Sequence, residues 1–474
     1  MADPQFEAKL DAVVERHVLG CDGLISAERL SGGASQETYR LVTRSPDGER
    51  LLAMRRAPGG IKVEAVANHP GLAVEALLMQ SAKAAGVPEP EVFYVLQDAD
   101  GLGDGFIMEW LDGEALGARI VRSPQLDEIR PKLANECGQI LARIHAIDLQ
   151  ATGLNQRLDT TTPADYVDQT WERYRVFDTP QPMIDYAGRW LMERLPDSVA
   201  PALVHNDFRN GNIMVSPDGV VAVLDWEVAH IGDPMRDLGW ICTNSWRFGR
   251  SDLAVGGFGH LDDLIAGYES VSGTEVDRER VKFWEVFGSF WWAIGCLGMA
   301  EHYRVGPDQT VERPAIGRRS SECQVDCVNL LIPGSVELVT PNDLTRSQDM
   351  PRTDELLISV RDFLRGDVMS ETHGRTNFMA RVAGNSLDIV LRELALSDAG
   401  RALEHARLQS LLDADADLDA LRWRLVHGLR DGSMALDLPG LAEHLRVTVV
   451  NQIAIDQPRY SGYKTATAGT IDVI

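Results

Sequence analysis

The residues best placed to do chemistry lie in one segment, LVHNDFRNGNIMVSPDGVVAVLDWEVAHIGDPMRDLGW, residues 203–240. Asp207 and Asn212 are five residues apart in a predicted loop, and Asp225 ends the apolar run VVAVL. A strand-loop-strand hairpin would bring the three side chains together. Two carboxylates and an amide offer the oxygen ligands that Mg²⁺ prefers, with water and phosphate oxygens filling the remaining positions. One further carboxylate can then accept a proton from an attacking hydroxyl.

This segment resembles the catalytic core of the aminoglycoside phosphotransferase and choline kinase family, whose members are relatives of the protein kinases. The matching pattern is HxDxxxxN, then a metal-binding LDW/E strand, then GDPxxDL. The resemblance implies that Asp207 is the catalytic base and that Asn212 and Asp225 hold Mg²⁺. It also implies that His205 and Asp237 support the loop rather than react.

Three neighbouring residues each have two interpretations. Asp233 is a structural support by resemblance, but it also precedes Pro234 as a helix cap would. Arg209 is a candidate contact for an anionic acceptor, or else a surface salt bridge. Glu227 is either a water-mediated metal contact or a surface carboxylate.

Upstream, the resemblance identifies a strand and a helix that would hold the nucleotide. LAMR, residues 52–55, matches the V-A-I-K strand of kinases and places Ala53 and Arg55 on one face. Arg stands where Lys is usual, and both side chains can span phosphates. The expected partner of Arg55 is Glu75, with Glu64 as the alternative.

The glycine-rich loop and the hinge complete the implied ATP site. SGGASQETY, residues 31–39, occupies the place of the glycine-rich loop, so that Ser31, Gly32 and Gly33 would approach the phosphates; a plain hairpin turn is the alternative. FIMEWL resembles the hinge between lobes, which implies Met108 as gatekeeper and adenine contacts from the backbones of Glu109 and Leu111.

Strand and helix patterns predict a small sheet lobe, a mainly helical lobe and a further helical unit. The resemblance implies that the first two form an α+β fold of the two-lobed protein-kinase type, with a C-terminal all-α domain after them. Five short strands and one helix, at 71–85, indicate an antiparallel sheet lobe, and an amphipathic helix after Pro124 opens a helical lobe. Five further helices are expected at 355–363, 376–396, 399–412, 418–429 and 441–455. The predicted units are an N-lobe at 1–111, a C-lobe at 112–332, a linker at 333–351, a helical accessory domain at 352–457 and a tail without a helical face at 458–474.

The accessory domain resembles a small helical domain of unknown function that accompanies such kinases, a match carried by DQPRYSGY at 456–463. It contains no nucleophile, metal or phosphate pattern. Two roles stay open: shaping the acceptor site, or an assembly interface that would make the protein a homo-oligomer.

The amino-acid composition and charge limit the classes of partner that we expect the protein to bind. The 474 residues carry a formal charge of −25, which repels nucleic acids and anionic membranes, so we expect neither as a partner. Six scattered cysteines do not form a disulfide framework, the N-terminus lacks a signal-peptide pattern, and no apolar stretch reaches the ~20 residues of a membrane span. These features predict a cytoplasmic protein, and the resemblance implies a small-molecule substrate.

The acceptor is the most open question. LAMRRAPGG and HNDFRNGNIM resemble the branch associated with acyl-CoA dehydrogenases, which implies a hydroxyacyl-CoA or a related intermediate as acceptor. An aminoglycoside or amino-alcohol kinase and a nucleotide-binding scaffold without transferase activity are the alternatives. An aromatic run at helical spacing is read either as core or as an apolar acceptor wall: Phe283, Trp284, Phe287, Phe290, Trp291 and Trp292. The candidates for CoA phosphates are Arg247, Arg250, Arg313, Arg318 and Arg319.

Overall fold

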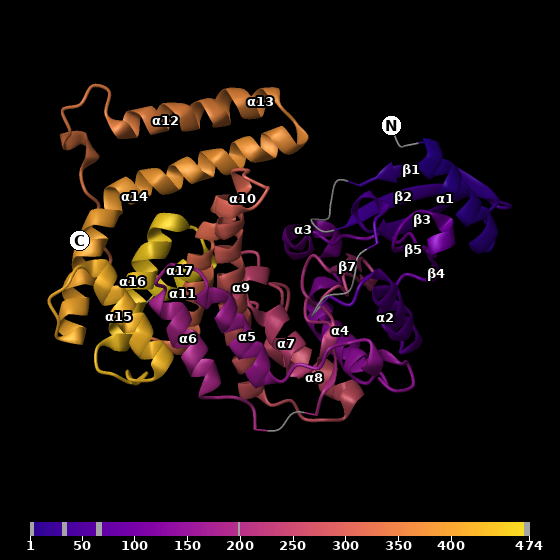
Figure 1. Ribbon diagram of the computed structural model, residues 1–474, viewed down its shortest axis with the longest axis horizontal. Coiled ribbons are helices and arrows are strands. Elements are labelled where there is room, and N and C mark those ends of the chain that lie inside the picture. The colour runs from indigo at the N-terminus through magenta and orange to yellow at the C-terminus, as the bar shows by residue number, and fades with distance from the viewer. Residues whose placement is uncertain (1–3, 31–35, 63–68, 198–199, 469–474) are drawn as a thin grey trace.

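The N-terminal lobe is an antiparallel sheet with two helices, one before its first strand and one between its third and fourth strands. The structure, a computed structural model, describes residues 4–30, 36–62, 69–197 and 200–468. The strands β1 (Gly23–Arg29), β2 (Glu37–Ser45), β3 (Gly48–Arg56), β4 (Val92–Val95) and β5 (Gly105–Glu109) are ordered β1-β2-β3-β5-β4. Helix α2 (Leu72–Ala84) connects β3 to β4, and α1 (Pro4–His17), which the sequence patterns did not predict, covers β1 (Figure 1).

Alternation of apolar and polar residues explains the sheet. Leu41, Leu52 and Ile107 point to one side, where Leu10 and Val14 of α1 cover them in a small separate core. Ala53 pairs with Met108 across β3 and β5, and Arg55 pairs with Phe106. Ala53 and Arg55 therefore lie on the same side of β3, as its alternation predicts.

The second lobe is mainly helical and carries two short strand pairs that hold the loop of Asp207. β6 (Ala202–Val204) pairs with β9 (His230–Gly232), and β7 (Ile213–Ser216) pairs with β8 (Gly219–Val223). The surrounding helices are α3 (Gly117–Arg122), α4 (Arg130–His145), α5 (Pro163–Arg175), α6 (Pro182–Met192), α7 (Met235–Cys242), α8 (Leu261–Ser272), α9 (Arg278–Val305), α10 (Glu312–Arg318) and α11 (Ser320–Leu331).

The C-terminal region is helical and differs from the expected pattern in two places. Its elements are α12 (Thr353–Phe363), a π-helical turn (Leu364–Val368), α13 (Met369–Glu371), α14 (Gly374–Leu412), α15 (Leu418–Asp431), α16 (Leu441–Asp456) and α17 (Ser461–Thr467). The predicted break between 396 and 399 is wrong, because Ser397 and Asp398 continue α14 and no proline interrupts it. The expectation that the tail has no helix is also wrong. The buried residues of α17 are the small Ser461, Gly462 and Ala466, so large apolar residues do not mark its face.

The C-terminal helices share one apolar core with the helical lobe. Leu421 and Leu425 of α15 and Val450 of α16 belong to the same buried cluster as Trp171 and Phe290. α15 packs on α6, and α16 packs on α11 (Figure 1). Within the described residues, the segment 333–351 contains no helix longer than the 3₁₀ turn Leu344–Arg346. Most of its residues are exposed, but Val336 is buried and the Val339 amide donates to Asn451 Oδ1 at 2.8 Å, which attaches the segment to α16.

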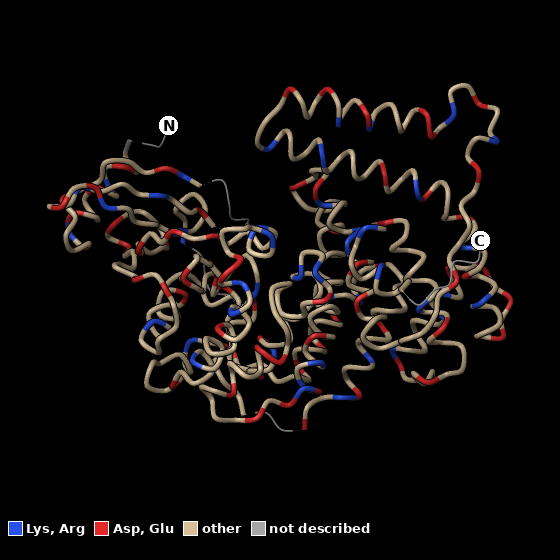
Figure 2. Tube along the Cα trace, turned by 180° about the vertical axis from the view of Figure 1, so that it is seen from behind, with Lys and Arg blue, Asp and Glu red and all other residues tan. Residues whose placement is uncertain are grey.

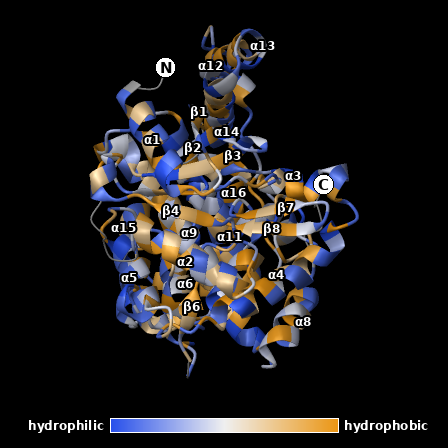
Figure 3. Cartoon of the chain, turned by 90° about the vertical axis from the view of Figure 1, so that its right-hand side faces the viewer, coloured by the Kyte–Doolittle hydropathy of each residue, from blue (hydrophilic) through white to orange (hydrophobic). Residues whose placement is uncertain are grey.

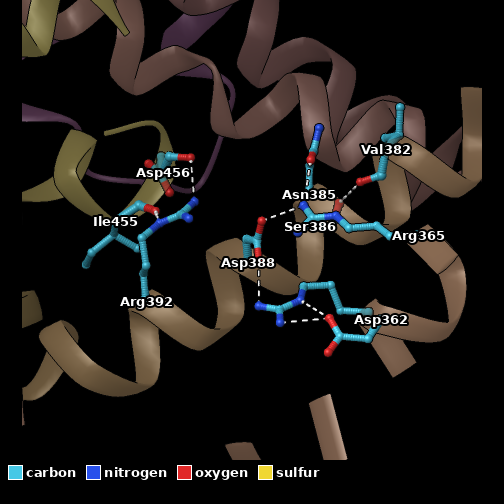
Figure 4. Close-up of polar contacts among 10 residues, drawn as sticks. Asp362, Arg365, Val382, Asn385, Ser386, Asp388, Arg392, Ile455 and Asp456 are labelled. Carbon is cyan, nitrogen blue, oxygen red and sulfur yellow. Dashed lines mark hydrogen bonds and ion pairs between the residues drawn. The ribbon is translucent and has the colours of Figure 1, made fainter. Parts of the chain in front are cut away.

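An arm formed by α12, α13 and the first half of α14 stands away from this core in both views (Figures 1 and 3). Acidic and basic residues are interspersed along both of its helices (Figure 2). Arg365 donates to Asn385 Oδ1 and to Asp388 Oδ2, which joins the two helices (Figure 4). At its base Arg392 donates to the carbonyl oxygen of Ile455 at 2.5 Å, near the end of α16. Across the described residues, no helix combines the length and apolar character needed to cross a membrane.

Candidate active site

The loop between β6 and β7 brings Asp207, Asn212 and Asp225 together. The Leu224 amide donates to the carbonyl oxygen of Asn212 at 2.7 Å, which ties the loop to the end of β8. Asn206 and Asp225 both have left-handed backbone conformations, with φ of 70° and 69°. Residues other than glycine hold such conformations only where their surroundings impose them, often at functional sites.

The carboxylate of Asp207 is fixed by three N–H donors among the described residues. Oδ1 accepts from Trp240 Nε1 and from Arg209 Nε, each at 2.8 Å. Oδ2 accepts from Asn212 Nδ2 at 2.5 Å. The side chain is 19% exposed, so one part of the carboxylate reaches solvent. The orientation of Asp207 is therefore set before any substrate arrives.

Arg55 links the two lobes. Its guanidinium lies 2.7 Å from Glu75 Oε1 on α2 and 2.5 Å from Asp225 Oδ1 in the helical lobe, and Glu227 Oε2 is 3.7 Å away. Arg55 Nε also donates to Gln36 Oε1. Glu75 is thus the helix partner of Arg55, while Glu64 and the glycine-loop residues Ser31, Gly32 and Gly33 lie outside the described residues.

Three carboxylates around one guanidinium leave an excess of negative charge. Burial raises the pKa of Glu75, and the negative charges of Asp225 and Glu227 raise it further. The positive charge of Arg55 lowers it, and together these effects place the pKa of Glu75 at about 7. Burial would lower the pKa of Arg55, but Glu75 and Asp225 raise it overall. Glu227 faces this cluster rather than open solvent. The site is chemically suited to a further cation.

His205 and Asp237 hold the backbone of the loop. Asp237, fully buried, accepts from the amides of His205 at 2.9 Å and Asn206 at 2.7 Å, and its Oδ2 lies 3.1 Å from His145 Nε2. Burial raises the pKa of Asp237, but hydrogen bonds and charge from His145 and His205 bring it below its ordinary value. The Asp207 amide donates to His205 Nδ1 at 3.2 Å.

Asp233 combines the two roles that the sequence left open. Its Oδ1 accepts from the Met235 amide at 2.9 Å, as a residue at the start of a helix does. The same fully buried carboxylate accepts from Arg280 Nε at 2.7 Å and Trp284 Nε1 at 2.8 Å. It therefore starts α7 and also fastens α7 to α9.

Some aromatic residues of α9 lie in the buried core, and others lie near Asp207. Phe283, Trp284, Phe287 and Phe290 are buried, whereas Trp291 and Trp292 are half-buried. Trp291 lies edge-on to Trp240 at 5.4 Å between ring centroids, and Trp292 lies 6.0 Å from Trp246. Beside Asp207 there is therefore a cluster of four tryptophans: Trp240, Trp246, Trp291 and Trp292.

Arg209 is neither a free cation nor a simple surface residue. Besides its contact with Asp207, its guanidinium lies over the ring of Trp246 at 4.3 Å from the centroid.

Each of the five candidates for CoA phosphates contacts a carboxylate of this chain: Arg247 with Glu285, Arg250 with Asp252, Arg313 with Asp308, Arg318 with Glu393 and Asp456, and Arg319 with Glu322.

The hinge region lies where β5 ends. Met108 is half-buried beside Ala53, and the Glu109 amide donates to the carbonyl oxygen of Glu91 at 2.8 Å. That amide is therefore engaged within the sheet lobe. Within the described part of the chain, the Leu111 amide has no hydrogen-bond partner.

Sequence reasoning missed two residues of this site. Trp240 donates to Asp207, and its signal was its place three residues after Asp237, one helical turn away on α7. Gln36 contacts Arg55, and it lies within SGGASQETY, directly after its small residues. Neither side chain titrates, so a search for ionisable or metal-binding residues passed over them.

Comparisons with known proteins agree with this geometry. The model of the phosphotransferase enzyme family (APH) matches residues 26–274, just over half of the chain, and a domain of unknown function, DUF6285, matches residues 370–460. A crystal structure of a putative aminoglycoside phosphotransferase from Ralstonia eutropha superposes with a TM-score of 0.55 at 25% identity. It covers 67% of this chain and 95% of its own.

Two relatives are acyl-CoA dehydrogenase family members. Member 10 of Mus musculus is 32% identical over 256 residues, which are 51% of this chain and 22% of that protein. Member 11 of Gallus gallus is 27% identical over 305 residues, 60% of this chain and 38% of that protein. The chain thus spans well under half the length of these two relatives. The expected two-lobed fold is confirmed, and the chain belongs to the phosphotransferase enzyme family.

Proposed function

We propose that this phosphotransferase is an ATP- and Mg²⁺-dependent kinase that transfers a γ-phosphoryl group to the hydroxyl of a small molecule. The observation that carries the proposal is the meeting of Asp207, Asn212 and Asp225 beside the Arg55–Glu75 pair, where the two lobes touch. Phosphoryl transfer needs mainly positioning and neutralisation of charge, and these are the groups that supply both.

The donor set fits Mg²⁺ bound together with a nucleotide. In the described residues no group of three or more His, Cys, Asp and Glu side chains could hold a metal ion by itself. Mg²⁺ commonly takes only one or two protein ligands and fills its other positions with water and phosphate oxygens. Asn212 and Asp225 would hold the ion, which would neutralise charge on the phosphates. The negative excess around Arg55 favours such a cation.

The hydrogen bonds of Asp207 indicate where the acceptor would sit. Each carboxylate oxygen has two lone pairs. Oδ1 already accepts from Trp240 and Arg209, while Oδ2 accepts only from Asn212 among the described donors. An acceptor hydroxyl would therefore donate to Oδ2, which aligns its oxygen for attack and takes its proton.

The nucleotide would lie between β3 and the helical lobe. Arg55, oriented by Glu75, would contact phosphate oxygens through its planar fork of donors. Ala53 and Met108 would border the adenine, the carbonyl of Glu109 and the amide of Leu111 would bond it, and Ser31, Gly32 and Gly33 would cover the phosphates.

For the acceptor we favour a hydroxyacyl-CoA or a related hydroxylated acyl compound. The tryptophan cluster beside Asp207 offers an apolar wall that suits an acyl chain. The chain's own cations already lie over two of its rings, Arg209 over Trp246 and Arg173 over Trp291. That arrangement disfavours a polycationic acceptor. Because the five predicted arginines are paired, a CoA phosphate would have to bind elsewhere or displace a carboxylate.

The test is a panel of acceptors incubated with Mg-ATP and followed by phosphorus NMR. The panel contains hydroxyacyl-CoA esters, amino alcohols and aminoglycosides, with Asp207→Asn as the matched inactive control. The proposal predicts a new phosphomonoester signal with a hydroxyacyl ester and none with the control enzyme.

Other outcomes decide between the alternatives. Phosphorylation of an amino alcohol or an aminoglycoside alone would replace the acyl acceptor by the cationic class. A hydroxyacyl ester that is phosphorylated equally well by Asp207→Asn would remove Asp207 from the mechanism. Binding of Mg-ATP without transfer to any acceptor would favour the scaffold alternative.

A further inference from the structure

A cavity of about 300 Å³ lies between the helical lobe and the C-terminal helices, away from Asp207. The start of α6, α9, α10 and α11 form one wall, and α14, α15 and α16 form the other (Figure 1). None of Trp240, Arg209 and Asn212, the side chains that contact Asp207, lines it. Its volume is at the lower end of the range for small-molecule pockets.

A buried histidine without partners lines this cavity. His444 on α16 is 2% exposed, and among the described residues neither ring nitrogen has a hydrogen-bond partner. Burial, together with Arg407 and Arg422, lowers its pKa to about 3. The ring is therefore neutral at physiological pH, with one N–H free to donate. Native proteins rarely leave such a group unsatisfied, so an unpaired one requires an explanation.

Arg407 on α14 is a second group without its usual partner. It donates to Thr448 Oγ1 at 3.1 Å, but its buried Nε has no partner and no described carboxylate lies within 4 Å of it. Burial lowers its pKa, and the nearby carboxylates do not restore it. A partly buried guanidinium without a counter-ion favours an anion from outside the chain.

The acidic residues of the cavity are already engaged. Glu404 accepts two hydrogen bonds from Arg422, at 2.8 Å and 2.5 Å. Glu393 and Asp456 both contact Arg318. Arg401 adds a further positive charge at the exposed rim. The lining thus contains four arginines against three carboxylates, and each of these carboxylates is already paired with an arginine.

The rest of the lining is mixed, and apolar side chains from both parts of the chain contribute to it. Met183 and Leu297 come from the helical lobe, and Leu403, Leu445 and Val449 come from the C-terminal helices. Such a wall accommodates a short hydrocarbon group that would be excluded from water. A ligand that fills the cavity would touch both parts of the chain.

From these contacts we propose that this cavity binds a small organic anion. Its carboxylate or phosphate head group contacts Arg407 and His444, and its short apolar part lies against Leu297, Leu403 and Leu445. The site does not depend on the catalytic function proposed above. Because the ligand would contact α11 and α16 together, its binding stabilises their packing by mass action.

Calorimetric titration of the full chain tests this with three probes of one chain length: butyrate, butyl phosphate and butylammonium. We expect one of the two anions, or both, to bind with a dissociation constant below about 1 mM, and butylammonium not to bind. Binding by only one anion identifies the head group. The variant Arg407→Gln should weaken binding at least ~10-fold, because it removes a charge-assisted hydrogen bond.

Three further variants separate the site from other effects. Arg424→Gln is the matched control, because Arg424 is exposed on α15 and does not line the cavity. It should bind as the wild type does. Arg401→Gln, at the exposed rim, tests the site without risk to folding and should weaken binding. His444→Leu should weaken it as well, because it removes the buried donor.

Three results would overturn the proposal. One is an absence of anion binding to the wild-type chain up to about 10 mM. Another is unchanged affinity in folded Arg407→Gln, Arg401→Gln and His444→Leu. The third is competition between the anion and a magnesium complex of a non-hydrolysable ATP analogue, which would place the anion in the cleft between the lobes.

Discussion

Asp207 carries the proposed chemistry, yet its position depends on side chains that take no part in it. The indole of Trp240 is the most informative of these, because it donates to Oδ1 from a helix that Asp237 and Asp233 anchor. A donor held by a buried helix keeps the carboxylate in one orientation. Orientation of this kind is expected to affect turnover more than substrate binding.

We predict that Trp240→Phe lowers kcat about tenfold or more while the affinity for nucleotide changes little. The substitution keeps an aromatic ring but removes the N–H, and a hydrogen bond to a charged group contributes about 1.5–3 kcal/mol. Steady-state kinetics together with nucleotide titration would measure both quantities. Trp190→Phe, on α6, is the control and should leave kcat unchanged. A rise in the dissociation constant of the nucleotide with normal kcat would contradict the assignment.

Asp326 gives a pH dependence that does not involve the catalytic residues. Burial raises its pKa to about 7, although Tyr460 and Asn244 donate hydrogen bonds to it. A carboxyl group with a raised pKa in the folded state stabilises the protein below its unfolded pKa of about 4, and this contribution is lost as the pH rises to about 7.

The free energy of unfolding should therefore fall between pH 5 and pH 7, by about 2 kcal/mol from this group. In Asp326→Asn that part of the fall should be missing. Urea denaturation of both proteins across this pH range measures the difference between the two curves. Parallel curves would show that Asp326 titrates at its ordinary pKa.

At the level of residues, motif spacing and the resemblance singled out acidic and amide groups whose roles are proposed above. In the structure Asp207 contacts Asn212, and Arg55 contacts Glu75 and Asp225. Trp240 and Gln36 could not be found in this way. Their contacts depend on how α7 and the start of β2 pack in three dimensions, and a single sequence gives no signal for that packing.

Among the elements, α17 and the residues just before it fasten the end of the described chain to the helical lobe. Tyr460 Oη donates to Asp326 Oδ2 at 2.6 Å, Asn329 Nδ2 donates to the carbonyl oxygen of Gly462 at 2.9 Å, and Arg446 bonds the carbonyl oxygen of Ala466. Asp326 also accepts a hydrogen bond from Asn244. Asn244 is two residues before Trp246, which belongs to the tryptophan cluster. Tyr460, a residue before the last helix, is thus linked through Asp326 to Asn244.

Tyr460→Phe should lower the free energy of unfolding by about 1–3 kcal/mol, because it leaves a buried carboxyl oxygen without its donor. The measurement is urea denaturation at pH 7. Tyr303→Phe is the matched control, since Tyr303 is 41% exposed, and it should change stability by no more than about 0.5 kcal/mol. Equal stability of the two variants would show that the Tyr460 hydroxyl contributes nothing.

The elements also show where sequence patterns lose information. The five strands were predictable because turn residues separate runs that alternate in polarity. The continuation of α14 past residue 396 was not predictable. Ser and Asp favour caps and turns, but a long helix such as α14 tolerates them in its interior when packing supports it. Helix α17 is short and buries small residues, so it carries no apolar periodicity.

At the scale of the whole molecule, the phosphotransferase part and the C-terminal helices share one core. Leu425 of α15 and Val450 of α16 are fully buried in the cluster that contains Phe290 of α9. Arg430 of α15 donates to Asp185 of α6 at 2.7 Å, and that carboxylate is fully buried. A contact surface that is this apolar and contains a buried ion pair resembles the interior of one folding unit.

We therefore predict that these two parts unfold in a single transition. Differential scanning calorimetry should show one peak, and Leu425→Ala should shift that whole peak to lower temperature, since truncating a buried leucine costs about 2–5 kcal/mol. The control Leu356→Ala, on the exposed face of α12, should leave it in place. Two resolved peaks, only one of which moves in Leu425→Ala, would contradict a shared core.

The central claim is that Asp207 aligns and deprotonates an acceptor hydroxyl beside a nucleotide held by Asn212, Asp225 and Arg55. The most direct measurement compares the wild type with Asp207→Asn, by nucleotide titration and by single-turnover phosphoryl transfer to the acceptor that the panel identifies. We predict that Asp207→Asn binds the nucleotide as tightly as the wild type and transfers phosphate at least ~10²-fold more slowly. Transfer at the wild-type rate in this variant would contradict the account.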